Sequence, residues 1–435
     1  MHHLGAFSFK KIGKMKKVCL FGLTCVAILL LTLTSCAGDV NTNFDSHFNE
    51  DGTLIEDSTT CVFQSERPQK VKFYVEVSGS MNGFFRPNRP TEFKADLWNV
   101  ISYYSPLAPE ICVLTNDGDQ GATFDQGNFQ TKMNTGAFVS TASTKVPVML
   151  QTIISNLNTD EGEVAVLVSD MKYSPVGAAA PQVLMTQYST DVAKILGSYG
   201  KAVSLICATS NYLDKSGNEV CQNSPYYYFL IGNQEHVSDM RNGISTLLYN
   251  RGHLVDNIES GFDYGHAAHS FGISNRCQQL EDEPTFVQYE EAEDGDTCTV
   301  KLKVNLENYR WLMSVKKYFS EAFKAKALYN SEIKVGNIDI DVKNVTGTDK
   351  ALRREATATV ELKVFNMATD SEVIEWNLDL PVTDYTLLNQ FFEGAIDEND
   401  PSKSYSVIDF VKGMFYGSVV TKDLKPNYIL ISKKG

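Results

Sequence analysis

Three short segments carry oxygen-bearing side chains of the kinds that bind a hard cation. In Glu76-Val77-Ser78-Gly79-Ser80, a carboxylate and two hydroxyls occupy alternate positions. Asp170 follows an apolar run, and Thr144 stands directly before another apolar segment. Mg²⁺ and similar ions take oxygen ligands in octahedral geometry, keep several waters and need only one or two carboxylates. The three segments therefore offer side chains of the types that such an ion takes as ligands.

These side chains can meet only if the elements before them are neighbours in the fold. Apolar runs predict strands, and segments with helical apolar spacing predict helices. The predicted strands are residues 71–77, 110–115, 163–169, 202–208 and 226–232. The predicted helices are residues 91–105, 146–157, 183–199 and 235–249. This alternation predicts an α/β domain over residues 70–250, with a doubly wound, mostly parallel sheet and one antiparallel edge strand at residues 121–124. Such folds bind ligands outside the carboxyl ends of their strands, so the strands ending at Val77 and Ser169 are expected to be adjacent.

The order of these pieces resembles the von Willebrand factor A (vWA) family. That family's first strand ends in Asp-x-Ser-x-Ser, and this loop, a threonine from a second loop and an aspartate after the central strand hold one Mg²⁺-type ion. Glu76 to Ser80, Thr144 and Asp170 match the three pieces in order, and the resemblance covers about residues 70–250. It therefore implies that Glu76, Ser78, Ser80, Thr144 and Asp170 are the ligands of one divalent cation. It implies a Rossmann-like fold and an adhesion or interaction module, not an enzyme, in which a partner's carboxylate completes the shell of the ion.

Two residues depart from the family pattern. Glu76 stands in place of aspartate and adds one methylene at the tightest corner of the site, which either pushes the carboxylate onto the ion or displaces the ion. Met171 stands where the family has glycine after the aspartate. The alternative is a domain that kept the architecture and lost the ion.

The N-terminal region predicts a lipoprotein of the bacterial cell envelope. Lysines up to Lys17 precede an apolar stretch of residues 18–33 that is too short for a usual membrane span, and Leu33-Thr34-Ser35-Cys36 resembles a lipobox. Residues 1–35 are thus the expected signal peptide, and Cys36 the lipid-anchored N-terminus. Ala37 in place of aspartate favours sorting to the outer membrane. The polar residues 36–69 read as a flexible tether.

The chain after residue 250 has a different pattern. Residues 251–297 are acidic and rich in loop-forming residues, and they are expected to be a connector with little regular structure. Residues 298–435 show period-two alternation of apolar residues, as in Val300, Leu302, Val304 and Leu306. That pattern predicts a mostly β C-terminal domain of the sandwich type, with one helix over residues 407–415 and a closing strand at 427–432.

Composition limits the partners. The chain has 39 basic and 53 acidic residues, and loss of the leader with its five lysines leaves a net charge of −19. Such a chain repels phosphate backbones, so no nucleic acid is expected as a partner. Cys112 and Cys207 lie inside predicted strands and are expected to be buried thiols, whereas Cys61, Cys221, Cys277 and Cys298 lie in polar segments and can pair in three ways.

Other candidate sites are weaker. His266 and His269 have the spacing of two metal ligands but no third partner nearby in the sequence, and Asn116 to Asp119 read as a hairpin turn. Three functions follow from these patterns. The first is an envelope-anchored module that binds a protein or glycan partner, through the Mg²⁺-type ion. The second is a metal-free structural subunit of an envelope complex. The third is a serine hydrolase, which no suitably placed histidine supports.

Overall fold

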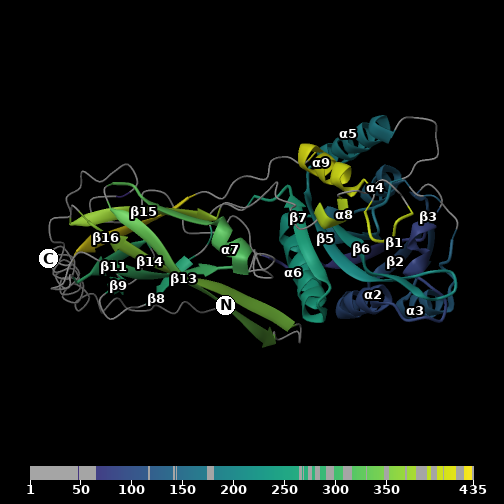
Figure 1. Cartoon of the computed structure of the whole chain (residues 1–435), viewed down its shortest axis with the longest axis horizontal. Coiled ribbons are helices and arrows are strands. Elements are labelled where there is room, and N and C mark those ends of the chain that lie inside the picture. The colour runs from purple at the N-terminus through teal and green to yellow at the C-terminus, as the bar shows by residue number, and fades with distance from the viewer. Residues whose placement is uncertain are drawn as a thin grey trace, which may run out of the picture.

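The structure is a computed structural model, and it separates the chain into two lobes (Figure 1). The described residues are 48, 65–115, 118–140, 143, 145–173, 181–263, 267, 269–272, 277–279, 285–290, 298–306, 316–329, 331–346, 352–367, 370–378, 389–392, 399–404, 406–417 and 426–433. We call the lobe built on residues 65–263 the α/β lobe, and the lobe that contains the later strands the β lobe. Cys36 and Thr144 lie outside the described residues.

A seven-stranded sheet forms the centre of the α/β lobe, in the order β3-β2-β1-β4-β6-β5-β7. Its strands are β1 (Lys70–Glu76), β2 (Glu110–Leu114), β3 (Gln120–Phe124), β4 (Glu163–Ser169), β5 (Ala202–Leu213), β6 (Glu219–Gly232) and β7 (Leu254–Ser260). The predicted antiparallel edge strand is β3, which pairs with β2. The α/β class and all five predicted strands are therefore present in the structure.

The expected mostly parallel sheet is wrong in its strand pairing, because the sheet is mixed. Only β1 pairs in parallel, with β2 and with β4, whereas β4–β6, β5–β6 and β5–β7 are antiparallel. The reason lies in the connection between β5 and β6. Only the turn from Asp214 to Asn218 separates them, and Asp214 closes it by accepting the backbone N–H groups of Ser216 and Asn218. A parallel pair needs a crossover of a dozen or more residues, so this connection forces a hairpin.

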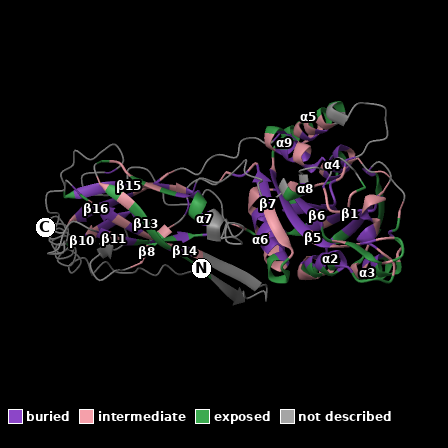
Figure 2. Ribbon diagram, in the orientation of Figure 1, coloured by how far each residue is buried: buried purple, intermediate pink, exposed green. Residues whose placement is uncertain are grey.

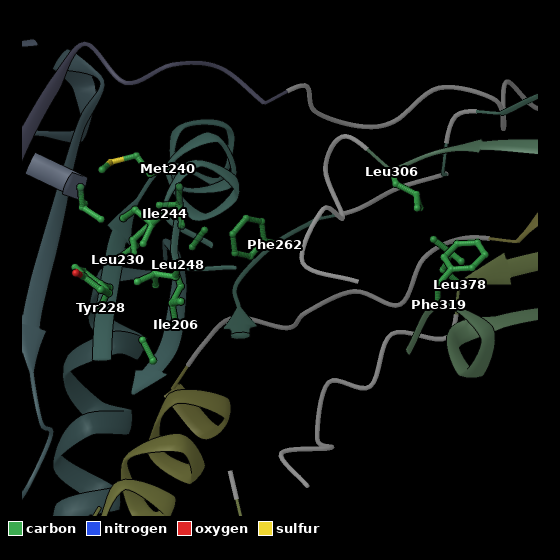
Figure 3. Packing of buried hydrophobic residues seen from close by; sticks show 14 of the residues in the cluster. Ile206, Tyr228, Leu230, Met240, Ile244, Leu248, Phe262, Leu306, Phe319 and Leu378 are labelled. Atoms are coloured by element: carbon green, nitrogen blue, oxygen red, sulfur yellow. The ribbon is translucent and has the colours of Figure 1, made fainter. Parts of the chain in front are cut away.

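Helices cover both faces of this sheet (Figures 1 and 2). One face carries α2 (Glu92–Tyr103), α3 (Gln126–Thr135) and α6 (Gln234–Arg251), and the other carries α4 (Val146–Ser155) and α5 (Pro181–Tyr199). Successive strand residues alternate between the two cores, with Phe73 and Val75 in the first and Tyr74 in the second. Figure 3 shows the first core from close by, where Met240 and Ile244 of α6 pack over the sheet.

The β lobe contains two mostly antiparallel sheets. The first has the order β12-β15-β16-β10-β9, from β12 (Phe323–Ala327), β15 (Ser371–Leu378), β16 (Asn427–Lys433), β10 (Phe286–Tyr289) and β9 (Cys277–Gln279). The second has the order β13-β14-β11-β8, from β13 (Glu332–Thr346), β14 (Leu352–Phe365), β11 (Cys298–Asn305) and β8 (His269–Gly272). Helix α7 (Lys316–Ala322) precedes β12. The predicted alternation is confirmed on β11, where Val300, Leu302 and Val304 are buried.

The segment 251–297 was expected to have little regular structure, and this expectation is wrong. It supplies β7 to the α/β lobe and β8, β9 and β10 to the β lobe. Three of these strands are only three or four residues long. Strands this short give no periodic signal, and they form because they pair with distant strands, as Phe286 of β10 does with Leu430 of β16.

The chain returns to the α/β lobe near its C-terminal end. Helices α8 (Asn389–Phe392) and α9 (Val407–Gly417) lie between β15 and β16 in sequence but beside α5 and α4 in space (Figure 1). Phe391, Phe410 and Met414 belong to the core that α5 shares with the central sheet. The predicted helix at 407–415 is present, although its sequence neighbours suggested that it belonged to the C-terminal β domain.

Parts of the predicted tether contact the folded lobes. Phe48 is 8% exposed and packs in a small cluster with Phe286 and Val373 of the β lobe. The Ser65 hydroxyl is 2.8 Å from the Ser238 hydroxyl on α6. Among the described residues, no helix has both the length and the apolar character that a membrane span requires.

Candidate functional site

The strands that carry the predicted ligands are neighbours. β1 and β4 pair in parallel, with Val75 opposite Val168, so both chains leave the sheet at the same edge. Glu76 is the last residue of β1, and Asp170 directly follows β4. The expected adjacency of the strands ending at Val77 and Ser169 is therefore confirmed.

Glu76 is buried, with 1% of its surface exposed, and its carboxylate connects the two strands. The Ser169 hydroxyl at the end of β4 donates a hydrogen bond to Glu76 Oε2. The same Ser169 oxygen accepts the backbone N–H of Met171 at 2.7 Å. The glutamate thus helps to hold the segment that follows β4, which is the segment that positions Asp170.

Ser78 and Ser80 bring their hydroxyls together in the loop after β1. The two Oγ atoms are 2.9 Å apart, and Ser78 is 3% exposed. The 3₁₀ helix η1 (Ser80–Gly83) begins within this loop, and the Tyr212 hydroxyl holds it by donating to the Ser80 carbonyl at 2.9 Å. Two neighbouring oxygen ligands of an octahedral Mg²⁺, each at about 2.1 Å, are about 3.0 Å apart. The observed spacing therefore suits two adjacent ligands of one ion.

Asp170 has the one carboxylate oxygen in this region that is buried without a hydrogen bond. The side chain is 1% exposed, and its Oδ1 accepts the backbone N–H of Lys172 at 3.2 Å. Its Oδ2 has no hydrogen-bond partner. A buried polar atom without a partner costs about 1–3 kcal/mol, and a charged one costs more. A cation or a hydrogen-bond donor next to Asp170 Oδ2 would remove this cost. The oxygen atoms of Asp170, Ser78 and Ser80 fit a Mg²⁺-type ion.

The negative charge of Asp170 acts on three tyrosines of the α/β lobe. Burial raises the pKa of Tyr188 and of Tyr212, and the negative charge of Asp170 raises both further. Burial likewise raises the pKa of Tyr227, with smaller contributions from Cys207 and Asp170. The phenols therefore stay protonated and neutral at physiological pH.

Met171 has a backbone conformation that favours glycine. Its φ is +56°, in the left-handed region that non-glycine residues adopt at a cost of about 1–3 kcal/mol. The side chain is fully buried against the core beneath α5, which compensates for this strain. The turn after Asp170 thus combines a left-handed backbone with a buried, non-glycine side chain.

The structure unites Glu76, Ser78, Ser80 and Asp170 at one edge, whereas Thr144 lies outside the described residues and has no place in the site described. Ser143 and Lys145, on either side of Thr144, immediately precede α4. His266, Asn116 and Asp117 also lie outside the described residues, and His269 packs edge-on against Trp376 at 5.3 Å between ring centroids. Within the part of the chain that the structure describes, no three His, Cys, Asp or Glu side chains form a metal-binding group.

The sequence analysis did not include Ser169, whose hydroxyl donates a hydrogen bond to Glu76. Ser169 directly precedes the predicted ligand Asp170 in sequence. Its place before a predicted ligand was a usable signal. Sequence reasoning also missed Tyr212 and Tyr188, for which the sequence offered no signal, because α5 and the β5–β6 hairpin bring them to the site. Cys112 and Cys207 are buried and reduced, as expected, and Cys221 is reduced as well.

Comparisons with protein-family models, with curated proteins and with solved structures find no match for this chain. A function must therefore be inferred from the geometry of the site.

Proposed function

We propose that the chain is an envelope-anchored lipoprotein whose vWA-like α/β lobe binds a protein or glycan partner through a Mg²⁺-type ion. The observation that carries this proposal is the buried Asp170 Oδ2 without a hydrogen-bond partner. Asp170 directly follows β4, and β4 pairs with β1, which leads into the loop with the paired hydroxyls of Ser78 and Ser80. Ligand sites of doubly wound folds lie at this edge of the sheet.

Each side chain has a distinct part in this proposal. Ser78, Ser80 and Asp170 hold the ion, and Glu76 contributes directly or through water while it keeps its bond to Ser169. Thr144 is expected to supply a further hydroxyl. With one direct carboxylate, the bound ion keeps positive charge and an open position for a carboxylate of the partner. The chain is strongly acidic and repels an acidic partner, so such a partner needs a local positive charge to bind, which the ion supplies.

A metal-free structural subunit of a cell-envelope complex is the second candidate. One observation favours it: Ser78 and Ser80 bond to each other, and Glu76 bonds to Ser169, so most of the donor set is satisfied without an ion. A serine hydrolase has no support in the described residues. His253 bonds to Asp96 through Nδ1, and Nδ1 of His236 lies 3.1 Å from the Glu66 carbonyl. Neither of these contacts joins a histidine to Ser78 or Ser80, which a serine nucleophile with a histidine base requires.

We further propose that the two sheets of the β lobe form a sandwich, which the contact of His269 on β8 with Trp376 on β15 supports. The lipid on Cys36 is proposed to place both lobes at the outer membrane. Within this arrangement, the strand ends of the α/β lobe serve as the partner-binding surface.

Titration calorimetry of the full chain with Mg²⁺ and Mn²⁺ tests the proposal. Wild type should bind one ion, and Asp170→Ala should bind none, because it deletes the main negative charge at the site. Glu76→Asp restores the residue of the vWA family and should tighten binding. Asp160→Ala is a matched control, since Asp160 is exposed just before β4, at the opposite edge of the sheet. Absence of heat with either ion, in wild type and in Glu76→Asp, would leave the metal-free subunit.

A further inference from the structure

A segment from the far end of the chain lies over the edge of the sheet that holds the candidate site. We call residues 399–404 and 406–417 the strap; it comprises a loop and helix α9. The Ser406 hydroxyl accepts the backbone N–H of Tyr173 at 3.2 Å, directly after the Asp170 turn. The hydroxyls of Ser404 and Tyr227 are 2.7 Å apart, and both are buried. The strap therefore contacts two of the segments that surround Asp170.

The strap also binds a cationic side chain next to the site. Lys172 Nζ donates a hydrogen bond to the backbone carbonyl of Asp400 at 2.9 Å. Lys172 lies two residues after Asp170, so its ammonium is the nearest opposite charge in sequence to a carboxylate with one unpartnered oxygen. A lysine side chain is long and flexible, and an ammonium that reached Asp170 would compete with a metal ion for that oxygen.

Close helix packing holds the strap in place. α9 crosses α5 so closely that a Cβ on Gly413 would lie 2.6 Å from the backbone carbonyl oxygen of Ser189. Gly417 has a similarly close approach to Ala193. A larger side chain at either glycine meets backbone, which cannot move aside easily, so it must push α9 away from α5.

Both ends of the strap lead into the β lobe. β15, which ends at Leu378, precedes it, and β16, which begins at Asn427, follows it. These two strands are paired neighbours in one sheet, with Trp376 opposite Asn427. The strap is thus an extension of the β lobe that is docked on the α/β lobe, and any change in how the lobes associate acts on it.

We propose that the docked strap regulates the cation site, an inference that rests on the proposed function. When the strap is docked, Asp400 holds the Lys172 ammonium and Ser406 braces the Asp170 turn, so Lys172 does not compete with the ion for the buried Asp170 Oδ2. When the strap is released, Lys172 pairs with Asp170 and the ion is lost. Ion affinity therefore reports on the contact between the two lobes.

The test is a double-mutant cycle on the full chain in detergent, with Mn²⁺ affinity measured by calorimetry and release of α9 measured by amide hydrogen exchange. Gly413→Leu should expose the amides of α9 and weaken Mn²⁺ binding about tenfold. Lys172→Gln alone should change the affinity little, because the docked strap already engages Lys172. Gly413→Leu combined with Lys172→Gln should regain most of the affinity. If Gly413→Leu fails to fold, Ser406→Ala replaces it, since it removes the hydroxyl that accepts the Tyr173 backbone N–H.

Two results would overturn the regulation while leaving the proposed function intact. One is wild-type affinity in a variant whose α9 is released, and the other is a double variant that binds as weakly as Gly413→Leu alone. Absence of Mn²⁺ binding in wild type is a different result. It removes the proposed function, and the regulation falls with it.

Discussion

Replacing Asp170 by asparagine keeps the size of the side chain and removes its charge, so it separates the electrostatic role of this residue from its packing. In wild type without metal ions, Asp170 Oδ2 is buried and has no hydrogen-bond partner. An amide carries a smaller desolvation cost than a carboxylate. We therefore expect Asp170→Asn to be as stable as wild type in EDTA, or more stable by up to about 2 kcal/mol.

The order reverses when a divalent ion is present. An ion at 100 times its dissociation constant stabilises the folded state by about 2.7 kcal/mol, because it binds the native chain and not the unfolded one. For a lobe of about 200 residues this corresponds to a rise of about 5–11 °C in the melting temperature. Asp170→Asn should show none of this rise, so wild type should become the more stable protein in Mg²⁺.

Scanning calorimetry in EDTA and in saturating Mg²⁺ measures both effects, with Asp160→Asn as the control for an exposed acid. The reasoning is refuted if Asp170→Asn lowers the melting temperature in EDTA and wild type shows no rise in Mg²⁺. That pair of results would mean that the carboxylate serves the fold of the metal-free chain.

Three further predictions concern other parts of the chain. Asp96 on α2 is 1% exposed and accepts hydrogen bonds from Arg251 and from His253. Asp96→Ala leaves these partners without their carboxylate, so it should lower the free energy of unfolding by about 2–4 kcal/mol, as measured by urea titration. Burial lowers the pKa of Lys94 from 10.5 to about 8. The folded chain thus loses this proton at a lower pH than the unfolded chain, so stability should rise between pH 8 and 10.5 in wild type, relative to Lys94→Met. Cys36 should carry two or three acyl chains at the mature N-terminus, and mass spectrometry that finds it unmodified would contradict the lipoprotein prediction.

The site illustrates how far local patterns reach. Apolar runs before Ser78 and Asp170 predicted two strands, and the preference of ligands for the carboxyl ends of strands predicted that these strands pair. The pairing of β1 with β4 confirms it. The patterns did not reveal that Glu76 contacts Ser169, since that contact depends on the register between two strands 93 residues apart in sequence.

The central sheet shows the opposite case. The apolar runs of β5 and β6 were both predicted, but as separate strands of a mostly parallel sheet. The turn from Asp214 to Asn218 joins them into an antiparallel hairpin. Apolar content measures burial, whereas the direction of a strand depends on the length of the connection and on which edge of the sheet is free.

By itself, the sequence determined the α/β fold class and the places of the main strands and helices, because an element with one buried face must repeat its apolar residues at its own period. The candidate ligands Glu76, Ser78, Ser80, Thr144 and Asp170 came from the resemblance of their order to the vWA pattern. Only the tertiary structure decided that β5 and β6 pair antiparallel, and that the strap lies on α5 beside Asp170. The contacts of the strap join segments more than 200 residues apart, as Lys172 and Asp400 are. They form because packing in three dimensions stabilises them, and close approaches such as that of Gly413 to Ser189 exist only once both helices are in place.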